Sequence, residues 1–300
     1  MRRYGLMVAA AMGAVVAVLA GACAGPTPNP PLMAQPTAVN GISAFPGPAD
    51  TGVPADTTLT DYNGPMTITE PGTMIVARLI RGTLKVAAAN VTITRSKIIG
   101  NLDVDSAGSS VVLEDVEVDG APSKQPAIGF DNITMRRVDV HGSRVSVLCG
   151  SNCDIQDSWL HGQYLAPGAD WHVNGYVSNG GSNVIVRHNT LACEPLNNPD
   201  GGGCTGPASS FGDFAPLRNI AYELNLFVAG PGSYCLYAGY NPEKPYGDDP
   251  AEITVTNNIF QRGANGKCAS YGPVTSFKPG SGNVWSGNRW DDGTEVPAGG

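Results

Sequence analysis

Eight segments of eleven residues can be aligned along the chain, and this repetition constrains the fold more than any other feature. The first four segments begin at intervals of 20, 22 and 20 residues, and the later intervals lengthen to 31, 36, 33 and 30. No helical pattern separates them. The segments are NVTITRSKIIG (90–100), SVVLEDVEVDG (110–120), NITMRRVDVHG (132–142), NCDIQDSWLHG (152–162), NVIVRHNTLAC (183–193), NIAYELNLFVA (219–229), EITVTNNIFQR (252–262) and GNVWSGNRWDD (282–292).

Within a segment the second and fourth positions are mostly Val, Ile, Leu or Met, which is the period of two of a β-strand. Two short strands joined by a bend and repeated in this way form one coil of a right-handed parallel β-helix. We predict an all-β, single-stranded solenoid of about eight to nine coils, since the L-x-x-L-x-L pattern of the leucine-rich horseshoe is absent. The ninth position is apolar throughout and should face the core: Ile98, Val118, Val140, Leu160, Leu191, Phe227, Phe260 and Trp290.

The seventh position is Asn in the last four segments, at Asn189, Asn225, Asn258 and Asn288. Asparagine tolerates the left-handed conformation that a sharp turn needs, and stacked amides can bond between coils. We therefore predict an internal ladder with a structural role. Residues 51–93 are expected to form the N-terminal cap and first coil, which shield the open sheet edge. The β-helix domain then spans residues 51–293, and residues 294–300 form a disordered tail.

The first 23 residues have the layout of a secretory signal, with two arginines, an apolar run and small residues before Cys23. The sequence LAGAC at this point resembles a bacterial lipoprotein processing box, in which the cysteine receives a lipid anchor. Residues 24–50 are rich in Pro and Ala and nearly uncharged, which indicates a flexible tether. We expect an exported protein that is anchored by Cys23 to the outer face of the cell membrane, or secreted if the signal is only cleaved.

Six cysteines remain when Cys23 is set aside, and an even number in an oxidising compartment indicates disulfides. The pairing is formally open, but short loops favour Cys149 with Cys153 and Cys193 with Cys204, which leaves Cys235 with Cys268. Zinc is the alternative, although the spacings are not the C-x-x-C of zinc ribbons.

The chain is acidic, and its formal net charge of −8 becomes −10 when the two arginines of the signal are removed, because 16 basic and 26 acidic residues remain. Such a surface is a poor partner for nucleic acid. We expect a monomer whose partners are a polysaccharide and, through the anchor, the membrane.

The repeat register, together with TGVPADTTLT (51–60) and HVNGYVSNGGSNVIVRHNT (172–190), resembles the secreted bacterial β-helix proteins of the pectate-lyase-like superfamily. The resemblance covers residues 51–290 and implies the fold, whereas the superfamily includes lyases, glycoside hydrolases and non-catalytic surface proteins. Many relatives carry H-x-D-G-I-Q where this chain begins with His172. Here Asn174 replaces the acid and Val177 replaces the amide, and an Asn can bond a sugar but cannot transfer a proton as a carboxylate does.

The strands that precede the Asn-led strands are expected to line one ligand groove. Lysis of a uronate needs a base and a cation, so His172 is our candidate for proton transfer and Arg144 for stabilising negative charge. A buried His172 that bonds a neighbouring coil is the structural alternative. Lys124, Asp170, Asn174 and Tyr234 are expected to hold the sugar, and Asp213 and Tyr237 lie in the same set of segments.

The other histidines are expected to be structural. His141 and His161 both precede glycine at the same repeat position and should stack outside a turn, and His188 lies in the bend before Asn189. No motif requires a cofactor. Calcium is the candidate ion, at Asp248 and Asp249, although two carboxylates supply too few ligands alone.

The leading hypothesis is a lipid-anchored β-helix that acts on extracellular polysaccharide, as a lyase or as a glycoside hydrolase. Hydrolysis requires a pair of carboxyl groups. The alternative is a non-catalytic carbohydrate-binding or adhesive surface protein that uses the β-helix as a display scaffold. Asn174 and the want of an obvious carboxylate pair favour this alternative.

Overall fold

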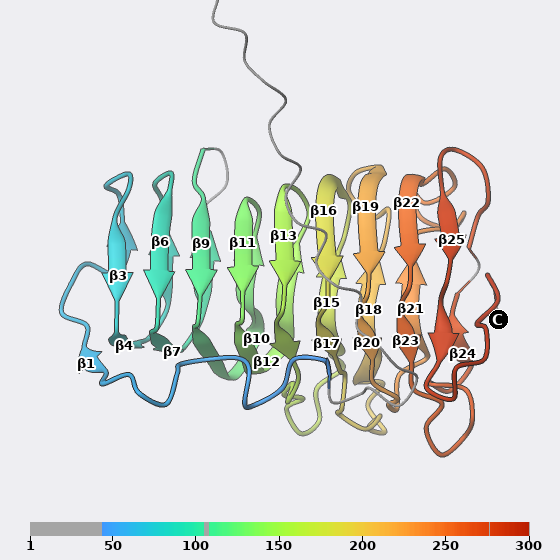
Figure 1. The fold of residues 1–300 in the computed structure, drawn as a ribbon, viewed down its shortest axis with the longest axis horizontal. Helices are drawn as coiled ribbons and strands as arrows, with labels where there is room; N and C mark the ends of the chain where they lie inside the picture. The colour runs from blue at the N-terminus through green and yellow to red at the C-terminus, as the bar shows by residue number, and fades with distance from the viewer. Residues whose placement is uncertain (1–43, 105–107, 276, 300) are drawn as a thin grey trace, which may run out of the picture. The chain divides into compact units, whose positions relative to one another are not determined.

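The computed structural model describes residues 44–104, 108–275 and 277–299. The expected signal, Cys23 and residues 24–43 of the expected tether lie outside these residues. The described strands form sheets of 17 and 9 strands, and successive coils pair in parallel (Figure 1). This is the parallel β-helix that the repeat predicted. Across the described ranges, no helix is long and apolar enough to cross a membrane.

The coils between the two ends contribute to three faces. The first face is the 9-stranded sheet of β3 (Met74–Val76), β6 (Val91–Thr94), β9 (Val111–Glu114), β11 (Ile133–Arg136), β13 (Cys153–Gln156), β16 (Gly181–Arg187), β19 (Leu217–Glu223), β22 (Ala251–Thr256) and β25 (Val284–Ser286). The second face comprises β1 (Thr60–Asp61), β4 (Arg78–Arg81), β7 (Lys97–Ile99), β14 (Trp159–Leu160), β17 (Thr190–Leu191), β20 (Leu226–Phe227), β23 (Ile259–Phe260) and β26 (Arg289–Trp290). The third face comprises β2 (Thr67–Ile68), β5 (Leu84–Val86), β8 (Leu102–Val104), β15 (His172–Ser178), β18 (Gly203–Ser210), β21 (Tyr234–Ala238) and β24 (Gly272–Val274). The long strands β10 (Glu117–Phe130) and β12 (Asp139–Cys149) cross from the second face to the third and join them into one sheet.

The core is built from columns of apolar side chains that the parallel register places one above another. The predicted ninth-position column runs in register from Ile98 to Trp290, and all eight residues are buried. Burial of each large side chain stabilises the fold by about 1.5–3 kcal/mol. The apolar ninth position therefore holds neighbouring coils together.

The asparagine ladder predicted for the seventh position is present inside the solenoid. Asn189, Asn225 and Asn258 are 0 % exposed. The Asn225 amide oxygen accepts from the backbone N–H of Asn189 at 3.0 Å, and the Asn258 amide oxygen accepts from that of Asn225 at 2.9 Å. Asn288 continues the column. Each buried amide oxygen thus accepts a hydrogen bond from a backbone N–H that water cannot reach.

The left-handed backbone lies at the sixth and first repeat positions, so its expected place at the seventh position was wrong. An L-residue pays about 1–2 kcal/mol for this conformation, and contacts between coils must hold it. The exposed first-position amides form a second ladder that links Asn132, Asn152, Asn183 and Asn219. The sixth-position residues have φ between 49° and 56°: Arg95, Asp115, Arg137, Asp157, His188, Leu224 and Asn257.

Residues 44–61 form a strap along the outside of the solenoid, from the coil of β17 back to the first coil (Figure 1). The backbone passes close to β12 at Gly52, where φ is +80° and an added Cβ would lie 3.2 Å from the Cβ of Asp139. Residues 44–50 are thus packed on the solenoid, unlike the flexible tether expected for 24–50, and the expected N-terminal cap takes the form of the strap and β1. The strap contacts are Ala44 with His188, Pro46 with Thr190, Gly52 with Arg137 and Asp56 with Arg95.

We expect this strap to loosen as the pH rises. His188 donates from Nδ1 to Asp157 at 2.6 Å and from Nε2 to the carbonyl of Ala44 at 3.2 Å, so it makes both contacts only as the imidazolium. The hydrogen bond to Asp157 raises the pKa of His188. A raised pKa means that this contribution to stability is complete below the unfolded value of about 6.5 and is lost as the pH rises through the folded pKa.

Urea denaturation from about pH 6 to about pH 9 checks this expectation. Over this range the free energy of unfolding of the wild type should fall by up to about 1 kcal/mol more than that of His188→Gln. The difference is small because the imidazole is partly exposed and its interactions are screened by water. His172→Gln is the matched control, since it removes an exposed histidine at the start of β15 without touching the strap anchor. An identical pH dependence in the wild type and His188→Gln would contradict the role of this contact.

The C-terminal half carries the covalent cross-links. The disulfides are Cys149–Cys153, Cys193–Cys204 and Cys235–Cys268, the pairing that short loops favoured, so these six cysteines do not form a zinc site.

The tail beyond residue 293 was expected to be disordered, but its described part is packed. Val296 is 0 % exposed, and its carbonyl accepts from the indole of Trp285 at 2.9 Å. The tail therefore closes the last coil.

Candidate functional site

An open groove of about 400 Å³ crosses β12, β15, β18 and β21 on the third face. Parallel pairing stacks the outward-facing positions of successive coils. Leu148, Val177 and Tyr237 belong to one such column and line the groove. Polar and charged groups surround this apolar floor: Arg144, His172, Asn174, Asn179, Thr205, Asp213 and Lys244.

Two long loops supply one wall of the groove. Lys244, from the loop between β21 and β22, pairs with Asp213 from the loop between β18 and β19 at 2.7 Å. Its ammonium also lies 5.5 Å from the centre of the Phe211 ring, a cation–π contact. The backbone N–H of Tyr246 donates to the carbonyl of Gly212 at 2.9 Å. These contacts join the loops into one wall and leave the Lys244 charge partly neutralised.

The two residues nominated for chemistry both line this groove. His172 begins β15 and is exposed, so it is not the buried histidine of the structural alternative. Arg144 follows the crossing of β12 onto the third face and donates from Nε to the carbonyl of Lys124 at 2.9 Å. Burial lowers the pKa of Arg144 from its ordinary value, but a guanidinium stays charged in proteins. The groove thus contains a fixed cation and an accessible imidazole.

Asn174 lines the groove and is only 5 % exposed. Its amide oxygen accepts a hydrogen bond from the hydroxyl of Ser209, one coil further on, at 2.8 Å. This bond fixes the amide plane and holds the side chain in one orientation. An acid at this position would meet the same serine, but the amide carries no charge and transfers no proton.

The structure separates the other three nominated sugar-binding residues from this groove. Lys124 is exposed beside Arg144 but does not line the cavity, and Asp170 is exposed in the loop before β15. Tyr234 lines an adjoining cavity of about 230 Å³. The sequence suggested a single site for these residues because the spacing of the coils does not show where a groove begins and ends.

Sequence reasoning missed Lys244 and Phe211 as groove residues. Both belong to loops whose course depends on contacts between coils, as in the pairing of Lys244 with Asp213. The one available indication was the lengthening of the repeat intervals in this half of the chain, because function in solenoids collects in insertions on one face.

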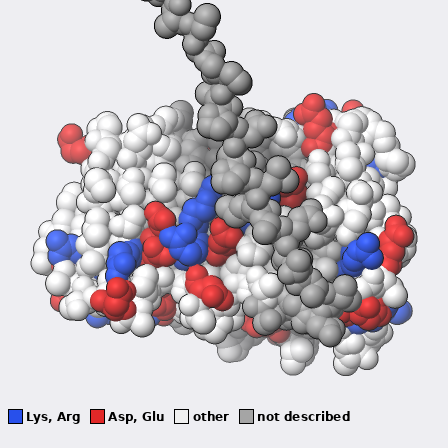
Figure 2. Space-filling model, in the orientation of Figure 1, with Lys and Arg blue, Asp and Glu red and all other residues white. Residues whose placement is uncertain are grey.

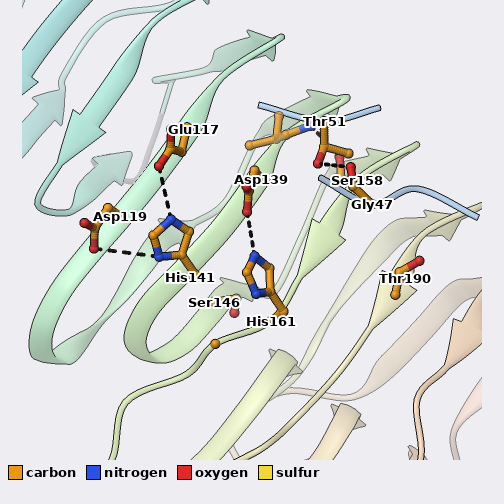
Figure 3. A network of polar contacts seen from close by, with 12 residues as sticks. Gly47, Thr51, Glu117, Asp119, Asp139, His141, Ser146, Ser158, His161 and Thr190 are labelled. Carbon is orange, nitrogen blue, oxygen red and sulfur yellow. Dashed lines mark hydrogen bonds and ion pairs between the residues drawn. The ribbon is translucent and has the colours of Figure 1, made fainter. Parts of the chain in front are cut away.

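A second cluster of charged side chains lies outside the groove, on β10, on β12 and directly after β14. His141 lies between Glu117 and Asp119, and His161 lies beside Asp139 at 2.8 Å (Figure 3). Hydrogen bonds from His141 and from Lys97 lower the pKa of Glu117 to about 2.

The two imidazole ring centres of this cluster are 5.4 Å apart, but the rings are tilted by 38° and do not stack as expected. His161 stacks instead on the indole of Trp159, with ring centres 3.4 Å apart. Neither His141 nor His161 lines the groove. Where residues are drawn in colour, Figure 2 shows Lys and Arg beside Asp and Glu, without a patch of one sign.

The candidate calcium pair makes other contacts. The carboxylate of Asp249 accepts from Lys278 at 3.4 Å and from Ser281 at 3.2 Å, and the hydrogen bond from Lys278 lowers its pKa. Within residues 44–104, 108–275 and 277–299, no group of three or more His, Cys, Asp or Glu residues is placed to hold a metal ion. The expectation of calcium therefore gains no support from Asp248 and Asp249.

Comparison with known proteins adds little to these observations. No family model and no curated protein matches the chain. A solved structure of trypsin-treated QnrB1, a plasmid-mediated fluoroquinolone resistance protein, is similar over 79 % of this chain and 92 % of that chain, at 10 % identity and a TM-score of 0.21. A TM-score this low gives no information about the functional site of this chain. The strand pairing of the chain itself shows that it folds as a parallel β-helix.

Proposed function

We propose that the protein binds an anionic extracellular polysaccharide in the groove and cleaves it by β-elimination. One observation carries the proposal: Arg144, His172 and Lys244 line a single open groove. A positively charged, partly buried guanidinium suits the planar carboxylate of a uronate, which it can bind through two hydrogen bonds.

The reaction follows from the chemistry of these groups. The neutral imidazole of His172 takes the proton from the carbon next to the carboxylate, and Arg144 stabilises the negative charge that grows on the carboxylate oxygens. The electron pair left on that carbon forms a carbon–carbon double bond as the bond to the glycosidic oxygen breaks. That oxygen takes a proton from the imidazolium or from water and leaves as the new chain end.

Hydrolysis fits the groove less well than elimination. Retaining and inverting glycosidases use two carboxyl groups that flank the scissile bond. Among the described residues that line the groove, Asp213 is the single carboxylate, and it is paired with Lys244. An elimination needs one base and one stabilising cation, which this groove contains.

Incubation of the whole protein with a panel of uronate polymers tests the proposal. We expect unsaturated products, which absorb in the ultraviolet, to accumulate with time. New reducing ends without this absorbance would overturn elimination in favour of hydrolysis. Binding of the polymers without either product would favour the non-catalytic binding function, to which the uncharged Asn174 also points.

We place this activity outside the cytoplasm. Three disulfides persist in oxidising compartments, and residues 1–23 have the layout of an export signal. The lipid anchor at Cys23 belongs to the same proposal. Mass spectrometry of the membrane fraction tests it, and a free thiol at Cys23 would contradict it.

A further inference from the structure

A second cavity of about 230 Å³ adjoins the groove on the third face. Phe211 and Tyr237 line both cavities, so a ligand in one lies next to a ligand in the other. Their electrostatic character differs. The first contains Arg144, Asp213 and Lys244, whereas no lining residue of the second within the described ranges carries a charge.

Aromatic rings dominate the second cavity. Tyr237 packs against Phe211, with ring centres 5.1 Å apart, and against Tyr234 at 5.5 Å in an edge-to-face geometry. Tyr271 packs on Tyr234 at 5.8 Å and is 69 % exposed, which extends the aromatic surface outward. Rings held by one another lose little conformational freedom when a ligand binds.

The polar groups of this cavity are neutral donors and acceptors. Tyrosine hydroxyls, the amide of Asn241 and the hydroxyl of Thr275 contribute to the lining. Burial raises the pKa of Tyr237, so its hydroxyl remains protonated at neutral pH. Two cations lie near rings of this cavity, and each is paired with a carboxylate. Lys278 is 5.5 Å from the Tyr240 ring and pairs with Asp249, and Lys244 is 5.5 Å from the Phe211 ring and pairs with Asp213.

This combination selects a particular kind of sugar residue. A pyranose has an apolar face of C–H groups that can stack on an aromatic ring, and a rim of hydroxyls that neutral donors and acceptors can bond. A carboxylate placed here would lose its hydration without gaining a cation, which is costly. The volume is below the range of about 300–1,000 Å³ usual for drug-sized ligands, in keeping with a single sugar ring.

We infer that this second cavity is a subsite for one uncharged pyranose residue, next to the acidic residue in the first cavity. The inference rests on the proposed function and deepens it. The substrate is then an acidic heteropolysaccharide in which neutral and uronate residues are neighbours, and a uronate homopolymer fills only part of the groove.

Calorimetry with neutral tetrasaccharides of glucose, galactose, mannose and xylose tests the subsite directly. We expect at least one of them to bind the wild type and Tyr234→Ala to weaken that affinity about tenfold, since a stacked ring contributes up to about 1.5 kcal/mol. Tyr234→Phe, which keeps the ring, should retain most of the affinity. Phe130→Ala is the matched control, because Phe130 is an exposed aromatic residue at the end of β10 that lines neither cavity.

The outcomes separate the subsite from the proposed function. No binding of any neutral tetrasaccharide to the wild type, or equal binding by Tyr234→Ala, would overturn the subsite even if uronate polymers are still cleaved. Neutral binding that Tyr234→Ala weakens, in a protein that neither binds nor cleaves uronate polymers, would support the neutral subsite and overturn the proposed function. Weaker binding of a mixed polymer by Tyr234→Ala, with uronate homopolymer binding unchanged, would support both.

Discussion

An Asn225→Ala variant is expected to unfold with a free energy about 4 kcal/mol below that of the wild type. The Asn225 amide makes four hydrogen bonds inside the solenoid. Its Nδ2 donates to the carbonyl of Val186 at 2.8 Å and to Asn258 at 3.0 Å, and its oxygen accepts twice from Asn189 at 3.0 Å. Alanine removes all four bonds and leaves buried partners unpaired, each at a cost of about 1–3 kcal/mol before the structure relaxes.

Urea denaturation at constant pH measures this loss. The matched control is Asn219→Gly, which removes a bond of the exposed outer ladder while glycine keeps the left-handed backbone. We expect the control to cost less than about 1 kcal/mol, because water replaces the lost bond. A cost for Asn225→Ala no larger than that of Asn219→Gly would show that the internal ladder does not stabilise the fold.

A His172→Ala variant is expected to lower kcat on the cleaved polymer by about 10²–10⁴-fold, the range for loss of a positioned base. KM should change little, because the imidazole acts mainly in the transition state. Arg144→Ala should lower kcat by about 10²–10³-fold, as for other groups that stabilise developing charge, and should also weaken binding of the carboxylate.

Steady-state kinetics on the same polymer measure both effects. Lys124→Ala is the matched control, since Lys124 is an exposed cation that lies outside the groove. Its hydrogen bond with Arg144 uses the backbone carbonyl of Lys124, which the substitution keeps. Full turnover by His172→Ala would remove this residue from the mechanism. A loss in Lys124→Ala equal to that in Arg144→Ala would mean that general surface charge, not the groove, drives the rate.

The sequence predicts those parts of the fold that each coil repeats. An apolar residue such as Leu160 or Phe227 must face the core in every coil, because the strand period and the stacking both require it. The buried asparagine column that contains Asn225 could be predicted from the sequence for the same reason. The bend at the sixth position was missed because residues as different as Arg137 and Leu224 adopt it there, held by neighbouring coils and not by their own preference.

The candidate site could be predicted only in part. His172 and Asn174 lie on one strand, and Arg144 lies on the strand before it, so repeat spacing places them together. Lys244 reaches the groove through a loop whose path depends on its pairing with Asp213. The strap depends on a contact between Ala44 and His188, which are 144 residues apart, and no local pattern encodes such a contact.

The strap changes how this solenoid should unfold. Coils that touch only their neighbours come apart one at a time from an open end. The strap bonds the bends at Arg95, Arg137 and His188, and β1 joins β4, so the coils from the first to that of β17 lose their structure together. Beyond β17 no strap contact is present among the described residues, and there the Cys235–Cys268 bond links successive coils. The molecule therefore consists of an N-terminal block that the strap makes more cooperative and a C-terminal block in which the Cys235–Cys268 bond adds a covalent link between coils.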